Sequence, residues 1–125
     1  CCGSREDGGK DNTHQDFGLF KETVRNLREL GVRAIGFGGG GDPSVYPHFA
    51  EALRYTRSQG LDVSVYTNGQ ALDEGAIDAI VDSCTWARVS LDADGPEMYK
   101  IAHGMPEKSY YKVLKNIKRL VQQLK

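Results

Sequence analysis

Hydrophobic residues along this chain alternate between helical spacing and short runs of β type. Apolar positions three and four residues apart predict helices over residues 17–30, 47–59, 73–84 and 109–124. Short apolar runs between them predict strands over residues 32–37, 61–67 and 86–91. The residues that follow the last predicted strand, up to 108, contain Asp92, Gly95 and Pro96 near their start and are predicted to be a loop.

Residues that start and stop helices agree with these boundaries. Asp16 and Asp73 stand where side-chain caps are expected, and Gly31 and Gly60 follow the predicted helix ends. The predicted strands begin about 25–30 residues apart, which is the length of a βαβ unit with a right-handed crossover. The order predicts an α/β fold with a parallel sheet. No linker is visible, so residues 1–125 are interpreted as one domain, with a polar, mobile loop over 1–16 and βα units over 17–125.

Composition gives no sign of a membrane protein or of a partner that is bound through a strong overall charge. The 125 residues carry a net charge of −1, so no global field would attract nucleic acid or an anionic membrane. No apolar run approaches the ~20 residues of a membrane span, and no signal peptide is visible at the start. A cytoplasmic location is therefore expected.

The odd count of three cysteines favours free thiols or metal ligands over a disulfide framework. The start at Cys1 and Cys2 without Met suggests a processed or excised chain.

Each predicted strand ends in polar or glycine-rich residues. The first leads into Gly38–Gly41 and Asp42-Pro43, the second into Thr67-Asn68-Gly69, and the third into Ser90-Leu91-Asp92. In parallel α/β folds functional groups collect at the carboxyl ends of the strands. Three such ends in succession predict one site at that edge of the sheet.

The glycine run permits two interpretations. Gly36, Gly38 and Gly41 satisfy the spacing of a dinucleotide-binding loop. That loop needs a helix directly after the third glycine and an acidic residue at the end of the next strand. Here Pro43 intervenes, and the next strand ends at Asn68 without a carboxylate. This interpretation therefore fails on its context.

The second interpretation is a resemblance to the radical S-adenosylmethionine (SAM) enzymes. The segment 37–43, Phe-Gly-Gly-Gly-Gly-Asp-Pro, resembles the Gly-Gly-Glu-Pro strand end of that family. Further likeness, in the family's order and spacing, is found in segments 30–37, 46–49, 59–69 with its Thr-Asn-Gly end, 89–92 (Val-Ser-Leu-Asp) and 116–120 (Asn-Ile-Lys-Arg-Leu).

The resemblance implies a partial βα barrel of the TIM type, of which this chain covers about half. In the family, a Cys-x-x-x-Cys-x-x-Cys loop holds a 4Fe-4S cluster whose fourth iron chelates SAM. Reductive cleavage of SAM then yields a 5′-deoxyadenosyl radical that abstracts hydrogen from a substrate. The resemblance places the first strand and two cysteines upstream of this chain, so the chain alone is not expected to hold a stable cluster or to be active.

The resemblance also implies roles for particular residues. Gly39, Gly40, Gly41, Asp42 and Pro43 would bind SAM, with the last two glycines and the aspartate meeting its methionyl ammonium group. Asp42 departs from the family, which more often has Glu there.

Further roles follow from the later strands and from the first residues. Ser90, and less strongly Asn68, would contact SAM, while Asp92 would face SAM or substrate. One of Cys1 and Cys2 would be a cluster ligand, with Cys1 preferred.

Several other residues are interpreted as structural. Cys84 and Trp86 are predicted to lie in the core, and His14 and His48 to be solvated. Asn68-Gly69 and Asp92–Gly95 are equally well explained as turns. His103 and Gly104 stand where the family often has Arg-Gly.

The expected partners are an electron donor such as flavodoxin or ferredoxin and a peptide or small-molecule substrate, with no membrane and no clear nucleic-acid signal. Exposed strand edges and an apolar face favour self-association of the chain. Two alternatives stay open: a non-catalytic α/β module that binds a nucleotide or phosphate through backbone amides, and an inactive barrel fragment.

Overall fold

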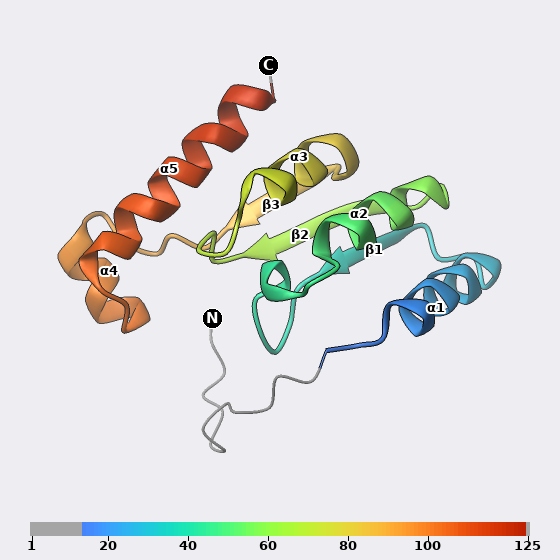
Figure 1. The fold of residues 1–125 in the computed structure, drawn as a ribbon. Coiled ribbons are helices and arrows are strands. Elements are labelled where there is room, and N and C mark those ends of the chain that lie inside the picture. Colours follow the sequence, from blue (N-terminus) through green and yellow to red (C-terminus); the bar gives the residue numbers. More distant parts are fainter. Residues whose placement is uncertain (1–13, 125) are drawn as a thin grey trace.

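The computed structural model describes residues 14–124 and contains one parallel sheet with helices between its strands (Figure 1). The elements are α1 (Phe17–Glu29), β1 (Ala34–Phe37), the 3₁₀ helix η1 (Pro43–Val45), α2 (Phe49–Ser58), β2 (Asp62–Thr67), α3 (Glu74–Ser83), β3 (Trp86–Val89), α4 (Pro96–His103) and α5 (Glu107–Gln123).

The expected capping residues start and end the helices. The Asp16 carboxylate accepts a hydrogen bond from the Leu19 N–H at 2.8 Å, and Asp73 accepts one from Ala76 in the same way. These bonds satisfy amides that the first turn of a helix leaves free. Gly31 follows α1 with φ of +88°, a conformation that favours glycine because it has no Cβ.

The sheet has the order β1-β2-β3, and both strand pairs are parallel. Ala34 of β1 is level with Asp62 of β2, and Ser64 of β2 is level with Trp86 of β3. The prediction of an α/β fold made of parallel βα units is confirmed.

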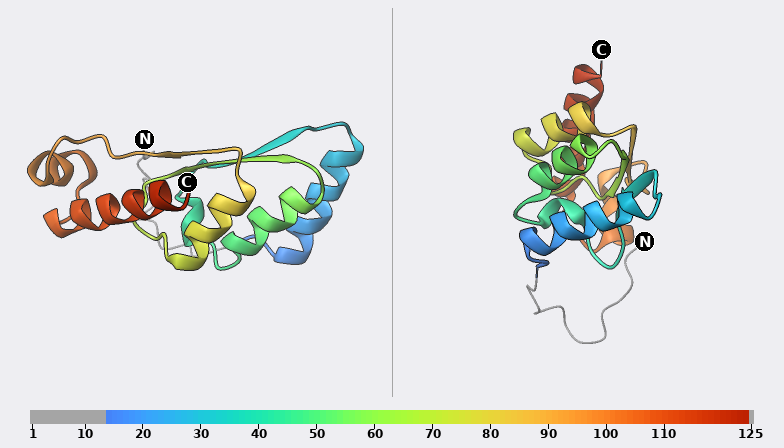
Figure 2. Two further views of the ribbon diagram at one scale, coloured as in Figure 1. Left: turned by 90° about the horizontal axis from the view of Figure 1, so that it is seen from above. Right: turned by 90° about the vertical axis from the view of Figure 1, so that its right-hand side faces the viewer.

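Helices α1, α2, α3 and α5 lie on one side of the sheet (Figure 2). Alternation along β2 shows the cause, because Val63, Val65 and Thr67 are buried while Asp62 and Tyr66 are exposed. The buried side chains form a core shared by β2 and the helices, with members Phe49, Leu53, Val63, Val65, Leu72, Ala76, Ile77, Ala79, Ile80 and Leu120. None of the helices in the described part of the chain is long and apolar enough to cross a membrane.

The opposite face of the sheet is open, and this overturns one prediction. Trp86 was predicted to lie in the core, yet 46% of its surface is exposed. β3 is an edge strand, and the Trp86 side chain lies on the face without helices, where its ring packs edge-on against Tyr66 at 4.9 Å. Position on a strand could not show which face the helices would leave open.

The segment 92–108 was predicted to be a loop, and that prediction is wrong for α4. Pro96 at its first turn and Gly104 at its end, with φ of +64°, are ordinary helix boundary residues. Met98, Ile101 and Ala102 stand at helical spacing, so the sequence did carry a signal for this helix, although only Tyr99 is buried in it. β3 also ends at Val89, two residues earlier than predicted, so Ser90 follows the strand.

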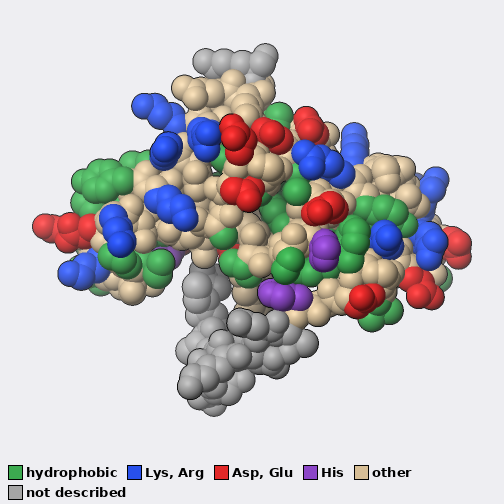
Figure 3. Space-filling view, viewed as in Figure 1, with side chains coloured by type: hydrophobic (Ala, Val, Ile, Leu, Met, Phe, Trp, Pro, Cys, Tyr) green, Lys and Arg blue, Asp and Glu red, His purple; other side chains and the backbone are tan. Residues whose placement is uncertain are grey.

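Surface charge and the described cysteine agree with the sequence analysis. Acidic and basic side chains are interspersed on the face shown in Figure 3, as the small net charge leads one to expect. Cys84 is half-buried against the core just before β3, and burial raises the pKa of its thiol to about 11. His14 and His48 are exposed.

Gly69 offers a test of the packing between the sheet and α5. Its φ is +76°, and an added Cβ would lie 3.0 Å from Val89 and 3.2 Å from Val113. We expect Gly69→Ala to lower the free energy of unfolding by roughly 2–5 kcal/mol, from backbone strain and overpacking together. Urea denaturation measures this loss.

Gly60→Ala is the matched control, because Gly60 has φ of +79° but an added Cβ there would meet no atom within 4 Å. It should lose only the ~1–2 kcal/mol of backbone strain. Equal losses in the two variants would contradict the packing described for Gly69.

Candidate functional site

The carboxyl ends of the three strands and the start of the segment after β3 surround a cavity of about 520 Å³. Its lining residues come from the three strand ends and from α4: Gly39, Gly40, Gly41, Asp42, Tyr66, Thr67, Asn68, Arg88, Ser90, Asp92 and His103. All the SAM-binding residues expected from the sequence lie in this lining except Pro43, which begins η1 behind it. The structure thus brings the three predicted strand ends together, as the parallel arrangement requires.

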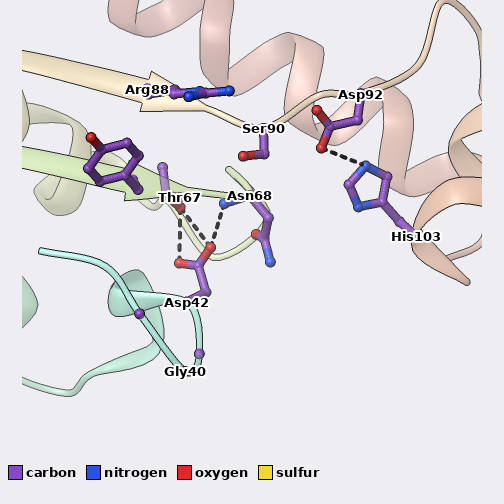
Figure 4. A pocket seen from close by; sticks show the side chains of 11 residues that line it. Gly40, Asp42, Thr67, Asn68, Arg88, Ser90, Asp92 and His103 are labelled. Atoms are coloured by element: carbon purple, nitrogen blue, oxygen red, sulfur yellow. Dashed lines mark hydrogen bonds and ion pairs between the residues drawn. The ribbon is translucent and has the colours of Figure 1, made fainter. Parts of the chain in front are cut away.

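Asp42 ties the glycine run to the end of β2 (Figure 4). Thr67 Oγ1 lies 2.9 Å from both oxygens of the Asp42 carboxylate and donates to them. The backbone N–H groups of Asn68 and Ser44 and the Ser44 hydroxyl also donate to this carboxylate. The backbone of Asp42 is extended, in agreement with the effect of Pro43 after it.

The four consecutive glycines have different structural causes. A Cβ at Gly38 would lie 3.3 Å from the Tyr66 side chain, and Gly39 has φ of +129°. Gly40 and Gly41 have neither constraint, because a Cβ there would meet no protein atom within 4 Å and φ is not positive. Packing within the described chain therefore explains the first two glycines but not the last two.

Asn68 and Ser90 place polar side chains at the same edge. The Asn68 Oδ1 accepts from the Gln70 N–H at 2.8 Å, which leaves the side-chain amide NH₂ as the group that can reach a ligand. The Ser90 N–H donates to the Thr67 carbonyl at 2.9 Å, so the backbone at Ser90 stays attached to β2 after β3 ends. Both residues thus serve as turn residues and as cavity lining.

Asp92 and His103 close the far side of the cavity. Asp92 has φ of +49°, and it is the one non-glycine residue among 14–124 with a positive φ. His103 Nε2 lies 3.1 Å from the Leu91 carbonyl oxygen and 3.8 Å from Asp92 Oδ2, and its ring stacks on Tyr99 at 4.3 Å. A carbonyl only accepts hydrogen bonds, so this contact requires a proton on Nε2.

Sequence reasoning missed four lining residues as parts of the site: Tyr66, Thr67, Arg88 and His103. The signal for Tyr66 and Arg88 was strand alternation, since each is exposed and the two are level in the sheet. Thr67 belonged to the Thr-Asn-Gly end already singled out, although its hydroxyl bond to Asp42 was not expected. His103 comes from α4, which was not predicted at all.

Metal-ligating groups are absent from the described residues, 14–124, where no three His, Cys, Asp or Glu side chains gather closely enough to hold an ion. Cys1 and Cys2, the predicted cluster ligands, lie outside that range. Cys84 precedes β3, so it lies at the end of the sheet opposite the cavity, as predicted.

Comparison with known proteins gives the family. No match to the chain was found among curated proteins. A sequence model of the radical SAM superfamily matches residues 1–125, the whole length of the chain, and the three parallel strands alternating with helices are consistent with part of a βα barrel. The chain therefore belongs to the radical SAM superfamily.

Proposed function

We propose that this protein is a radical SAM enzyme and that the cavity at the strand ends binds SAM beside a 4Fe-4S cluster. Family membership supports this function, and the volume of about 520 Å³ falls within the ~300–1,000 Å³ typical of small-molecule sites. When bound, the cluster supplies the electron that cleaves SAM to a 5′-deoxyadenosyl radical. The part of this chain is to hold and orient the cofactor and to keep water out.

The main support for SAM binding in this cavity comes from Gly40 and Gly41. Both line the cavity, and neither glycine is required by its backbone conformation or by neighbouring protein atoms. A glycine lets a ligand approach the backbone closely and use its carbonyl oxygens as acceptors. The methionyl ammonium group of SAM is a cation with three donors, so a row of carbonyls at a strand end suits it.

Asp42 acts in this proposal mainly by position. Its carboxylate accepts from three residues of the chain, Ser44, Thr67 and Asn68, which hold the glycine run against the end of β2. Negative charge next to the run also favours a cation there. The direct bond from the ammonium group to this carboxylate, expected from the family resemblance, stays a prediction.

The remaining polar lining suits the rest of SAM. Ser90 offers a hydroxyl and Asn68 a side-chain NH₂, and both groups can donate to a carboxylate or to ribose oxygens. The Asp92 carboxylate offers acceptors on the opposite side, beside His103, for hydroxyl groups of ribose or substrate.

Cys1 or Cys2 is proposed as the cluster ligand supplied by this chain. Cys84 is unsuited, because it lies at the opposite end of the sheet and its raised pKa, about 11, keeps the thiol protonated near neutral pH. Metal ligation needs the thiolate. A flavodoxin or ferredoxin is proposed as the electron donor, with a peptide or small molecule as substrate.

A test of the glycine run uses Gly40→Ala and Gly41→Ala. Each should raise the Kd for SAM at least about tenfold, because a methyl group would stand where the ligand approaches the backbone. The free energy of unfolding should change little, since no protein atom lies within 4 Å of either added Cβ. Calorimetric titration with SAM and urea denaturation measure the two quantities.

Gly95→Ala is the control for that experiment, because Gly95 has equally free space and extended backbone but lies outside the cavity lining. It should bind SAM as the parent does. Unchanged SAM affinity in both glycine-run variants would remove the main support for the proposed site.

Asp42→Ala tests the attachment of the run to β2. Removing this acceptor leaves the Thr67 hydroxyl without its carboxylate partner, so unfolding should become easier by about 1.5–3 kcal/mol. The Kd for SAM should rise about ten- to a hundredfold because the glycine run loses its anchor and the nearby charge. Asp42→Glu should be milder in both respects, and exposed Asp94→Ala is the control. SAM binding as tight as the parent's in Asp42→Ala would show that the site does not depend on Asp42.

Replacing cysteines in the full-length protein tests the cluster. Serine at the ligating member of Cys1 and Cys2 should abolish bound iron and sulfide after anaerobic reconstitution, because a ligand is lost. Cys84→Ala should retain both. Iron content that depends on Cys84, or on neither Cys1 nor Cys2, would contradict the assignment.

A further inference from the structure

An aromatic pair lies on the open face of the sheet beside the cavity. The rings of Tyr66 and Trp86 meet edge-on at 4.9 Å, and their surfaces are 45% and 46% exposed. Parallel sheets are normally covered on both faces, and packing within residues 14–124 leaves this face of the sheet open at the pair. A ligand that covers this pair would remove apolar surface from water.

Small residues surround the aromatic pair on the same face of the sheet. Gly36 and Gly38 precede and follow the end of β1 on the same face, and an added Cβ at Gly38 would press on the Tyr66 side chain at 3.3 Å. Ser64, level with Trp86, is small. The surface next to Tyr66 and Trp86 therefore carries only small side chains or none, which suits a flat ring.

Arg88 adds a positive charge to this surface. It lies two residues after Trp86 on β3, so both side chains share the open face, and it is level with Tyr66. Figure 4 shows its guanidinium group extending along the strand toward Ser90. Arg88 is the only lysine or arginine in the cavity lining formed by residues 14–124.

The carboxylates near Arg88 are engaged elsewhere. Asp42 accepts hydrogen bonds from its own loop and from the end of β2, and Asp92 Oδ2 lies 3.8 Å from His103. By contrast Arg57 and Arg119, on the helices, have carboxylate partners at 2.8 Å and 3.4 Å. Within the described residues Arg88 has no such partner.

We propose that Arg88 and the Tyr66–Trp86 pair form a subsite for a ligand that carries a carboxylate on or near a planar ring. The guanidinium group binds the carboxylate through two parallel N–H bonds, and the ring lies over the aromatic pair. The proposal deepens the function proposed above and rests on it for the presence of a second ligand. The carboxylate belongs either to such a substrate or to SAM. Because the methionyl carboxylate of SAM is far from its adenine ring, SAM would use the Arg88 guanidinium group without the aromatic pair.

Tryptophan fluorescence tests the subsite directly, because Trp86 is the only tryptophan of the chain. The probes are 4-nitrobenzoate and its neutral analogue 4-nitrobenzamide, since nitroaromatic rings quench indole emission on contact. We expect the benzoate to bind about tenfold more tightly than the amide, and Arg88→Gln to abolish that preference. Arg88→Lys should keep part of it, because the charge remains while the planar fork is lost.

The control is Arg54→Gln, an exposed arginine on α2, across the sheet from the open face, whose partner is Asp82 at 3.8 Å. It should leave both probes unaffected. Far-ultraviolet circular dichroism and urea denaturation of each variant establish that it is folded.

A second arm identifies the source of the carboxylate. Binding of SAM is compared with that of decarboxylated SAM, again in the parent and in Arg88→Gln. One outcome is that Arg88→Gln weakens the affinity for SAM about tenfold and leaves that for decarboxylated SAM unchanged. That result supports Arg88 as the partner of the SAM carboxylate. Unchanged SAM affinity together with a lost benzoate preference supports a separate substrate subsite.

The proposal is overturned if neither the benzoate preference nor the SAM affinity depends on residue 88. A parent protein that binds SAM but shows no such dependence retains the proposed function and loses only this subsite. A parent with a reconstituted cluster that does not bind SAM, yet shows the benzoate preference, retains the subsite and contradicts the proposed function.

Discussion

The site depends on one carboxylate that joins two strand ends. Asp42 accepts from the Thr67 hydroxyl, Thr67 Oγ1 accepts from the Gly69 N–H at 3.0 Å, and the Gly69 carbonyl accepts from Asn116 of α5 at 2.8 Å. Thr67, Gly69 and Asn116 are buried, so a missing partner would leave a polar group without compensation. This chain of bonds runs from the glycine run to the last helix. It therefore couples the position of the cavity wall to the packing of the whole fold.

The second constraint is that the helices packed on the sheet cover one of its faces. Burial of Val63 and Val65 fixes which side of β2 faces the helices, and alternation then turns Tyr66 outward. The same geometry brings the carboxyl ends of all three strands to one edge and leaves Cys84 at the other. In a βα barrel the face without helices is the interior, and active sites lie at the end of the barrel where the strands have their carboxyl ends. The exposure of the aromatic pair and of Arg88 is therefore a consequence of the core, and Tyr66 and Arg88 also line the cavity.

Membership of the radical SAM superfamily gives this arrangement a chemical meaning. A sulfonium cofactor with an ammonium group at one end needs acceptors on one wall and donors for its carboxylate on another. The cavity lining includes the glycine run beside the Asp42 charge, and Ser90 and Arg88 at the end of β3. Opposite charges thus stand at different parts of the lining, which would orient a ligand of mixed charge.

The sequence by itself determined the order of βα units, the helix caps and the three strand ends that form the cavity, because apolar periodicity, capping residues and glycine act locally. It also pointed to Gly39–Asp42, Asn68, Ser90 and Asp92, since parallel strands place their carboxyl ends together. Only the tertiary structure decided that α4 lies beside the strand ends, so that His103 reaches the cavity from there. The tertiary structure also decided that Trp86 is exposed and that the Thr67 hydroxyl donates to Asp42. It alone shows that no protein atom stands close to Gly40 or Gly41. Each of these depends on what lies across from a residue in space, which spacing along a chain does not contain.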